Sequence, residues 1–123
     1  MKWSRMELLQ AKDATIEFDE MIRFEPEVFS KMHQIRGLQD VTVSGNVHYE
    51  ASSERVFADL DIEGVMIVPC SITLEDVEYD FHTKSLEVFS FEKTDDEDVH
   101  GVKGDVVELL PVIFQLIVME VPL

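Results

Sequence analysis

The sequence predicts an α+β fold in which a mainly antiparallel sheet, curled or barrel-like, is closed by a C-terminal helix. Strand-like alternation recurs along the chain, two alternating stretches are joined by a short turn, and the last apolar stretch has helical spacing. The length of 123 residues suits one hydrophobic core. We therefore expect residues 1–123 to form a single domain.

The first elements mix helical and extended patterns. Residues 3–11 place apolar side chains three positions apart, which predicts a short amphipathic helix or an opening strand. Residues 15–24 alternate as in a strand with one buried face. Pro26 ends this strand because proline lacks the backbone N–H, and we expect a short helical turn within residues 27–35.

The centre of the chain predicts an antiparallel pair of strands. Residues 41–49 show the cleanest alternation of apolar and polar side chains, and residues 56–63 repeat it after the short connection Ala51–Glu54. The second strand runs on to Val68. It passes Gly64, where the missing side chain permits a bulge or a bend.

A third strand comes after the proline at the end of this run. Residues 77–82 alternate, and the pattern continues through residues 86–91. The alternation breaks at Val88 and Phe89, which predicts either a bulge or a strand paired on both faces. His82 belongs to the acidic face of this strand.

The stretch Glu92–Asp98 contains five carboxylates and no apolar residue. Such a run cannot pack into a core, so we expect a mobile acidic loop over residues 92–104. It lacks the glycine and the spaced terminal glutamate of a calcium-binding EF-hand loop. The alternative function is electrostatic docking of a basic partner, for which the candidate residues are Asp95, Asp96, Glu97 and Asp98.

The C-terminal segment, residues 105–121, is predicted to be helical. Asp105 and Glu108 have the spacing of a capping box. Pro111 would cost a continuous helix about 3 kcal/mol, so either the helix kinks there or a turn precedes a helix with Pro111 in its first turn. Apolar residues nearly encircle the segment. One side should face the sheet, and a segment beyond Leu123 or a second copy of the chain, forming a homodimer, should cover the other.

Pro69 and Cys70 end the long apolar run and resemble half of a zinc knuckle. A knuckle needs a second thiolate three residues later, and that position is Thr73. One cysteine and four scattered histidines do not make a structural zinc site, so we expect no metal and no cofactor. Cys70 is then a small, half-buried residue beside a turn.

The motif also resembles a known family. Members of the YceD-like family of large ribosomal RNA accumulation proteins carry a strand, then Pro-Cys-Ser-Arg-Cys-Leu-Glu, then a further strand. This chain matches that motif at Pro69, Cys70, Ser71, Leu74 and Glu75, and departs from it at Ile72 and Thr73. Its opening Met1-Lys2-Trp3 and its acidic, leucine-rich end resemble the family as well. The resemblance implies a non-enzyme that supports synthesis, processing or stability of 23S ribosomal RNA in large-subunit biogenesis in the bacterial cytoplasm.

The charge of the chain bears on its partners. With 26 acidic and 10 basic residues the net charge is -16, and such a protein repels phosphate backbones. We therefore expect an adaptor that binds a basic ribosomal protein or a basic rRNA-processing factor, and reaches rRNA only indirectly. The alternative is direct RNA binding by the N-terminal region, for which Trp3 and Arg5 are the candidate residues.

Other function classes find little support in the sequence. No nucleophile elbow, phosphate-binding glycine loop or His-Glu-x-x-His motif occurs, so we expect no enzyme. Asp59, Asp61 and Glu63 share one face of a strand, which is typical of a solvated surface. A lone cysteine suits a reducing compartment. No signal peptide is expected, because Lys2 is followed by Trp3, Ser4 and Arg5 and not by an apolar stretch. No membrane span is expected, because charges and Pro111 interrupt the apolar end.

Overall fold

The computed structural model describes residues 1–30, 32, 34–102 and 104–122. Its main element is a five-stranded sheet in the order β2-β3-β4-β5-β6. The strands are β2 (Thr15–Ile22), β3 (Gly37–Glu50), β4 (Arg55–Pro69), β5 (Asp76–Ser90) and β6 (Val99–Gly101). The first four are antiparallel neighbours in sequence order, whereas β6 pairs with β5 in parallel. The predicted α+β fold with a mainly antiparallel sheet is confirmed.

A second, two-stranded sheet joins the start of the chain to a segment of its C-terminal part. In it β1 (Lys2–Ser4) pairs antiparallel with β7 (Val106–Glu108). The helices are α1 (Arg5–Gln10) and α2 (Leu110–Val118), with the short 3-10 turns η1 (Lys12–Ala14) and η2 (Pro26–Phe29). No helix among the described residues is long and apolar enough to cross a membrane.

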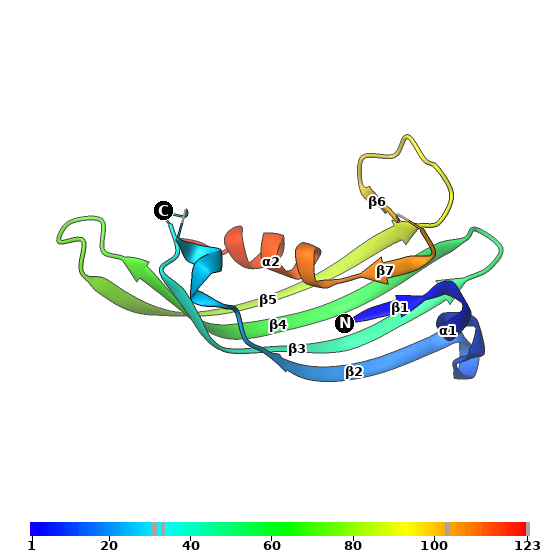
Figure 1. The fold of residues 1–123 in the computed structure, drawn as a ribbon, viewed down its shortest axis with the longest axis horizontal. Helices are drawn as coiled ribbons and strands as arrows, with labels where there is room; N and C mark the ends of the chain where they lie inside the picture. The colour runs from blue at the N-terminus through cyan, green and yellow to red at the C-terminus, as the bar shows by residue number, and fades with distance from the viewer. Residues whose placement is uncertain (31, 33, 103, 123) are drawn as a thin grey trace.

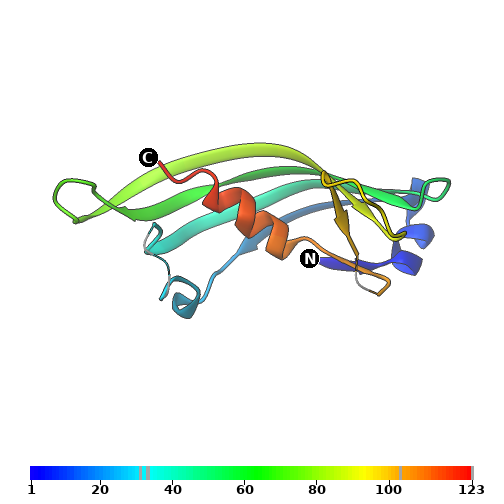
Figure 2. The same cartoon turned by 90° about the horizontal axis from the view of Figure 1, so that it is seen from above.

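The large sheet is bowed, and α2 and β7 lie on its concave side (Figures 1 and 2). It is curled but open, because β2 and β6 stand at opposite ends of the strand order. The barrel-like alternative is therefore wrong for the described residues. Alternate residues of β3 and β4 face α2 and form one core with it: Val41, Val43, Val47, Tyr49, Val56, Ala58, Leu60, Ile62, Met66, Val112, Ile113 and Ile117.

Two glycines allow the strands of the bowed sheet to approach closely. A Cβ on Gly45 would lie 1.8 Å from the carbonyl oxygen of Asp59, and its φ is +151°. Gly64 faces a bulge, but the bulge is in β3: the register shifts between Gln39 and Thr42, so two residues oppose Gly64. A Cβ there would lie 3.0 Å from the Cα of Val41. The predicted irregularity is thus on the neighbouring strand.

The ends of the chain correct two expectations. Residues 3–11 contain both a strand and a helix, and α1 begins with a capping box in which Ser4 accepts from the Glu7 N–H. The capping box predicted at Asp105 is wrong, because β7 occupies that stretch and α2 begins after Leu109 without a side-chain cap. Pro111 lies in the first turn of α2, as one of the two alternatives predicted.

The remaining differences concern β5 and the residues after it. β5 pairs with β4 in continuous register, so the bulge predicted at Val88 and Phe89 is wrong. Part of the loop predicted over residues 92–104 is strand β6, and residue 103 lies outside the described residues. The other side of α2 is partly covered from within the chain, because Phe114 packs against Phe24 at 5.5 Å between ring centroids. The homodimer stays a prediction.

Candidate functional site

The candidate site is the end of the β4–β5 hairpin, Val65–Asp80, which we call the distal arm. It forms one end of the molecule, beyond α2 (Figure 1). Pairing of β4 with β5 continues to Pro69 opposite Asp76, whereas pairing of β4 with β3 ends at Ile67 opposite Gly37. At position 69 there is no β3 residue to pair with, so the N–H that proline lacks costs the sheet no hydrogen bond to β3.

The tip of the distal arm is a six-residue turn, Cys70–Glu75, which carries most of the family-like motif. The Cys70 N–H donates to the Glu75 carbonyl at 2.8 Å, and the Leu74 N–H donates to the Cys70 carbonyl at 2.9 Å. Leu74 adopts a left-handed conformation with φ of 63°. Ser71, Leu74 and Glu75 are exposed, so the motif presents its side chains to solvent.

Cys70 is half-buried and lies in a polar turn. Hydrogen bonds from the Thr73 N–H, the Thr73 hydroxyl and the Ile72 N–H stabilise its thiolate and lower the pKa of the Cys70 thiol from 9.0 to about 7. Thr73 occupies the position at which a zinc knuckle has its second cysteine, and here it supplies hydrogen bonds to the sulfur of Cys70.

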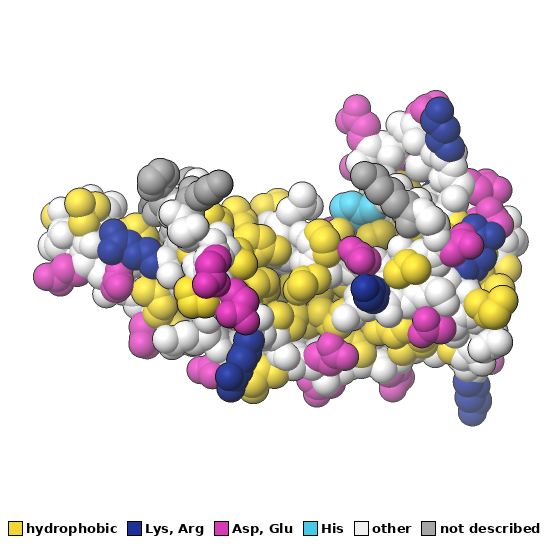
Figure 3. All heavy atoms as spheres, in the orientation of Figure 1, with side chains coloured by type: hydrophobic (Ala, Val, Ile, Leu, Met, Phe, Trp, Pro, Cys, Tyr) yellow, Lys and Arg dark blue, Asp and Glu magenta, His cyan; other side chains and the backbone are white. Residues whose placement is uncertain are grey.

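The distal arm combines exposed apolar side chains with carboxylates. The exposed fraction is 89% for Ile72, 66% for Leu74, 45% for Val77 and 40% for Tyr79. The acidic side chains of the same segment are Glu75, Asp76, Glu78 and Asp80, all exposed. Figure 3 shows hydrophobic and acidic side chains together at this end of the molecule. Arg36 pairs with Asp76 at 2.9 Å, and no other ion pair to these four acids occurs among the described residues.

The N-terminal candidates, Trp3 and Arg5, are held by contacts within the chain. The Trp3 ring packs on Phe18 with 5.5 Å between centroids, and its backbone pairs with β7. The Arg5 guanidinium lies 4.6 Å above the Phe91 ring and 3.5 Å from carboxylate oxygens of Glu54 and Asp105. These contacts neutralise Arg5 and occupy one face of its side chain.

The acidic-loop candidates lie away from the distal arm, beside the other end of β5. Asp95, Asp96, Glu97 and Asp98 are exposed. The Asp98 N–H donates to the Asp96 carboxylate at 3.0 Å, and the Val99 N–H donates to the Asp96 carbonyl at 3.3 Å. The loop thus ends in a local turn that leads directly into β6. The structure does not bring these residues together with Trp3, Arg5 or the Pro69–Glu75 turn into one site.

The convex face of the sheet, opposite α2, is acidic. The register places Glu17, Asp19, Asp59, Asp61 and Glu63 on this face. His82 was expected beside the acids of its own strand, but the carboxylate that it hydrogen-bonds is Asp61 on β4. Lys84 lies 3.8 Å from the other oxygen of Asp61. One acidic side chain therefore engages both basic groups of this part of β5.

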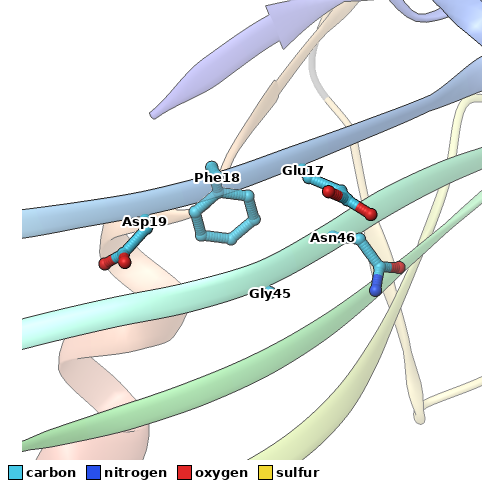
Figure 4. Close-up of a pocket in the computed structure, with 5 residues that line it drawn as sticks. All are labelled: Glu17, Phe18, Asp19, Gly45 and Asn46. Atoms are coloured by element: carbon cyan, nitrogen blue, oxygen red, sulfur yellow. The ribbon is translucent and has the colours of Figure 1, made fainter.

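The hollow over β2 and β3 offers no evident chemistry. It has a volume of about 400 Å³ and is lined by Glu17, Phe18, Asp19, Gly45 and Asn46. Figure 4 shows its two carboxylates flanking Phe18, with no basic or nucleophilic side chain among the labelled residues. Among the described residues, no three His, Cys, Asp or Glu side chains gather closely enough to hold a metal ion.

Sequence comparison finds a relative that matches the whole chain. The "Uncharacterized protein YlbN" of Bacillus subtilis (strain 168) is 36% identical over 126 aligned positions, which span all of this chain and 72% of the relative. No family model matches the chain. No solved structure matches it either.

Proposed function

This chain belongs to the family of the Bacillus subtilis protein YlbN, and from this starting point we propose that it is a non-catalytic, YceD-like factor of the cytoplasm. It supports synthesis, processing or stability of 23S ribosomal RNA during assembly of the large ribosomal subunit. It acts by binding a basic ribosomal protein or a basic rRNA-processing factor, and reaches rRNA through that partner.

The observation that carries this proposal is the placement of the family-like motif at the tip of the distal arm. Pro69 closes the strand, Cys70 begins the turn, and Leu74 and Glu75 complete it. A motif needed only for packing would be buried, whereas exposed loop side chains on a rigid scaffold are typical of binding. The tip therefore favours a role in contacting another molecule.

The surface favours a protein partner over a direct RNA partner. Binding to a nucleic-acid backbone depends on Lys and Arg that displace counterions, and the convex face carries carboxylates instead. At the N-terminus Arg5 is engaged by Glu54, Asp105 and Phe91. Within the N-terminal region, the RNA-binding alternative would have to rely on the exposed lysines Lys2 and Lys12.

Affinity capture from cell lysate, with and without nuclease, tests the proposal. We expect basic ribosomal proteins or processing factors to be retained after nuclease treatment. A parallel measurement compares large- with small-subunit ribosomal RNA in cells lacking the protein, and we expect the large-subunit RNA to fall. An RNA that resists nuclease and is captured without any ribosomal protein, with binding that weakens steeply with salt, would favour the alternative.

A further inference from the structure

We propose that the free edge of β5, Asp76–Glu87, binds an extended, basic segment of the partner as an additional strand of the sheet. This inference rests on the proposed function and specifies which partner segment the distal arm recognises. In such β-augmentation, main-chain hydrogen bonds supply affinity, and alternate side chains supply specificity.

The edge is long and unpaired. β5 pairs with β4 over its whole length, but on its other side β6 covers only Val88–Ser90. Among the described residues no strand pairs with the outer side of Asp76–Glu87. Because β6 already adds to this edge at one end, a partner strand would continue a surface that the chain itself uses for strand addition.

Two apolar side chains on the concave side of this edge, Val77 and Tyr79, are uncovered, whereas the neighbouring Phe81 is buried. Tyr79 is 40% exposed although its partner on β4, Met66, is fully buried. Val77 is 45% exposed opposite Val68, which is 7% exposed. A strand added beside β5 would place its own apolar side chains next to Val77 and Tyr79 and remove them from water.

On the convex side, the distal-arm part of this edge is acidic, whereas His82 and Lys84 further along it are engaged by Asp61. Glu78 and Asp80 lie opposite Ile67 and Val65 of β4, so neither has a cross-strand basic neighbour. Neither forms an ion pair among the described residues. Lys or Arg side chains at alternate positions of an incoming strand would complement both. The segment that fits alternates basic and apolar residues.

The other edge of the sheet does not fit this segment. β2 is shorter, and it places the exposed carboxylate of Glu20 on the side where β5 has Val77 and Tyr79. A charge on the apolar side of an edge strand disfavours pairing with another chain. Phe18 of β2 is already packed against Trp3. Binding at the β5 edge can therefore be compared with binding at the β2 edge in the same protein.

A synthetic peptide of about ten alternating lysine and valine residues, which spans most of the free edge, tests the inference with the full chain. Fluorescence anisotropy measures its affinity, and NMR-detected amide exchange locates the binding. We expect slower exchange of outward-pointing amides within Asp76–Glu87 and unchanged exchange within Thr15–Ile22. A peptide methylated at every backbone nitrogen, which has no N–H to donate along either edge, should not bind.

Two variants separate the apolar and the acidic contributions. Tyr79→Lys and Glu78→Lys should each weaken binding of the lysine–valine peptide about tenfold. Tyr79→Lys removes apolar contact with the incoming valines, and Glu78→Lys places a lysine beside the incoming lysines. Met21→Lys adds a positive charge to β2 and is the matched control, with binding within about twofold of the parent. All three positions are exposed, and far-UV circular dichroism should show unchanged folding.

The inference would be overturned by protection of β2 amides instead of β5 amides, by binding of the methylated peptide, or by equal binding of the peptide to all three variants. A further result would also overturn the inference. If, without peptide, the β5 amides become protected and the mass of the protein doubles as its concentration rises, a second copy of the chain occupies the edge. If capture of basic ribosomal proteins persists in Tyr79→Lys, the proposed function stands without this inference. If the peptide binds but large-subunit RNA is unchanged in cells lacking the protein, strand addition at the β5 edge stands and the proposed function fails.

Discussion

The two free edges of the large sheet, β2 and the part of β5 that β6 leaves unpaired, carry similar alternating patterns but differ in what covers them. On β2 the apolar side chains Ile16 and Phe18 are half-buried, and Trp3 packs on the second. On the distal arm of β5, Val77 and Tyr79 are exposed because no described segment lies beside or above them. The difference teaches that alternation identifies the face of a strand, whereas burial depends on segments distant in sequence.

The largest effect should come from disturbing the close approach of β3 to β4, two strands that lie between the edges. Gly45→Ala would force a Cβ to within 1.8 Å of the Asp59 carbonyl oxygen. We expect the free energy of unfolding to fall by about 3 kcal/mol or more, from strain and overpacking together. Urea denaturation followed by circular dichroism measures this. Gly101→Ala, where nothing lies within 4 Å of the added Cβ, is the control and should change little.

Truncating one aromatic side chain on each edge sharpens the comparison directly. Phe18→Ala should lower the free energy of unfolding by about 2 kcal/mol, less than for a fully buried phenylalanine. Tyr79→Ala should change it by no more than about 0.5 kcal/mol, because an exposed side chain loses little on truncation. Denaturation of both variants under identical conditions makes the test. Equal losses would mean that the distal arm is covered in solution.

A smaller effect is expected for the arginines associated with each region. Arg5→Met removes the cation–π contact with Phe91 and two ion pairs, and should cost about 1 kcal/mol. Arg36→Met removes the exposed ion pair with Asp76 on the distal arm, and should cost less than about 0.5 kcal/mol. Trp3 fluorescence during denaturation reports the first change. If Arg36→Met lowered the free energy of unfolding more than Arg5→Met, the contacts of Arg5 would not be the more stabilising ones.

The smallest structural effect should come from Cys70, although its chemistry is distinctive. Alkylation by iodoacetamide should reach half its maximal rate near pH 7, because the thiolate is the nucleophile and the pKa of Cys70 is lowered to about 7. In Thr73→Val the hydroxyl donor is lost, and the midpoint should move upward. Cys70→Ser should leave folding and partner capture unchanged. A midpoint near 9 in the parent protein would show that the turn does not stabilise the thiolate.

Much of the sheet could be predicted because each of its long strands has a local signal. The alternation in residues 41–49 and 56–63 follows from one buried face, and Pro69 has a direct backbone consequence. The same reasoning missed β6 and β7. A strand of three residues is too short to show an alternating pattern, and it forms because a neighbouring strand pairs with it. The prediction misplaced the cap at Asp105 for the same reason, because the backbone there pairs with Arg5 and β1.

The candidate site was predicted only in part. The Pro69–Glu75 motif was identified from its residue types, and its turn lies where expected. The free edge of β5 could not be identified, because sequence does not say which strand lacks a neighbour. The engagement of Arg5 was missed too, since Glu54 and Phe91 are distant in sequence. The capping box at Ser4 and Glu7, by contrast, had a local signal that could have found it.

The pairing of β1 with β7 has a consequence for the order of folding. The hairpins from β2 to β5 connect neighbours in sequence, so they can form early at a small cost in chain entropy. Lys2 pairs with Glu108, and closing so long a loop has to wait until the strands between them are in place. The N-terminus therefore docks last during folding and should be the first part of the sheet system to detach.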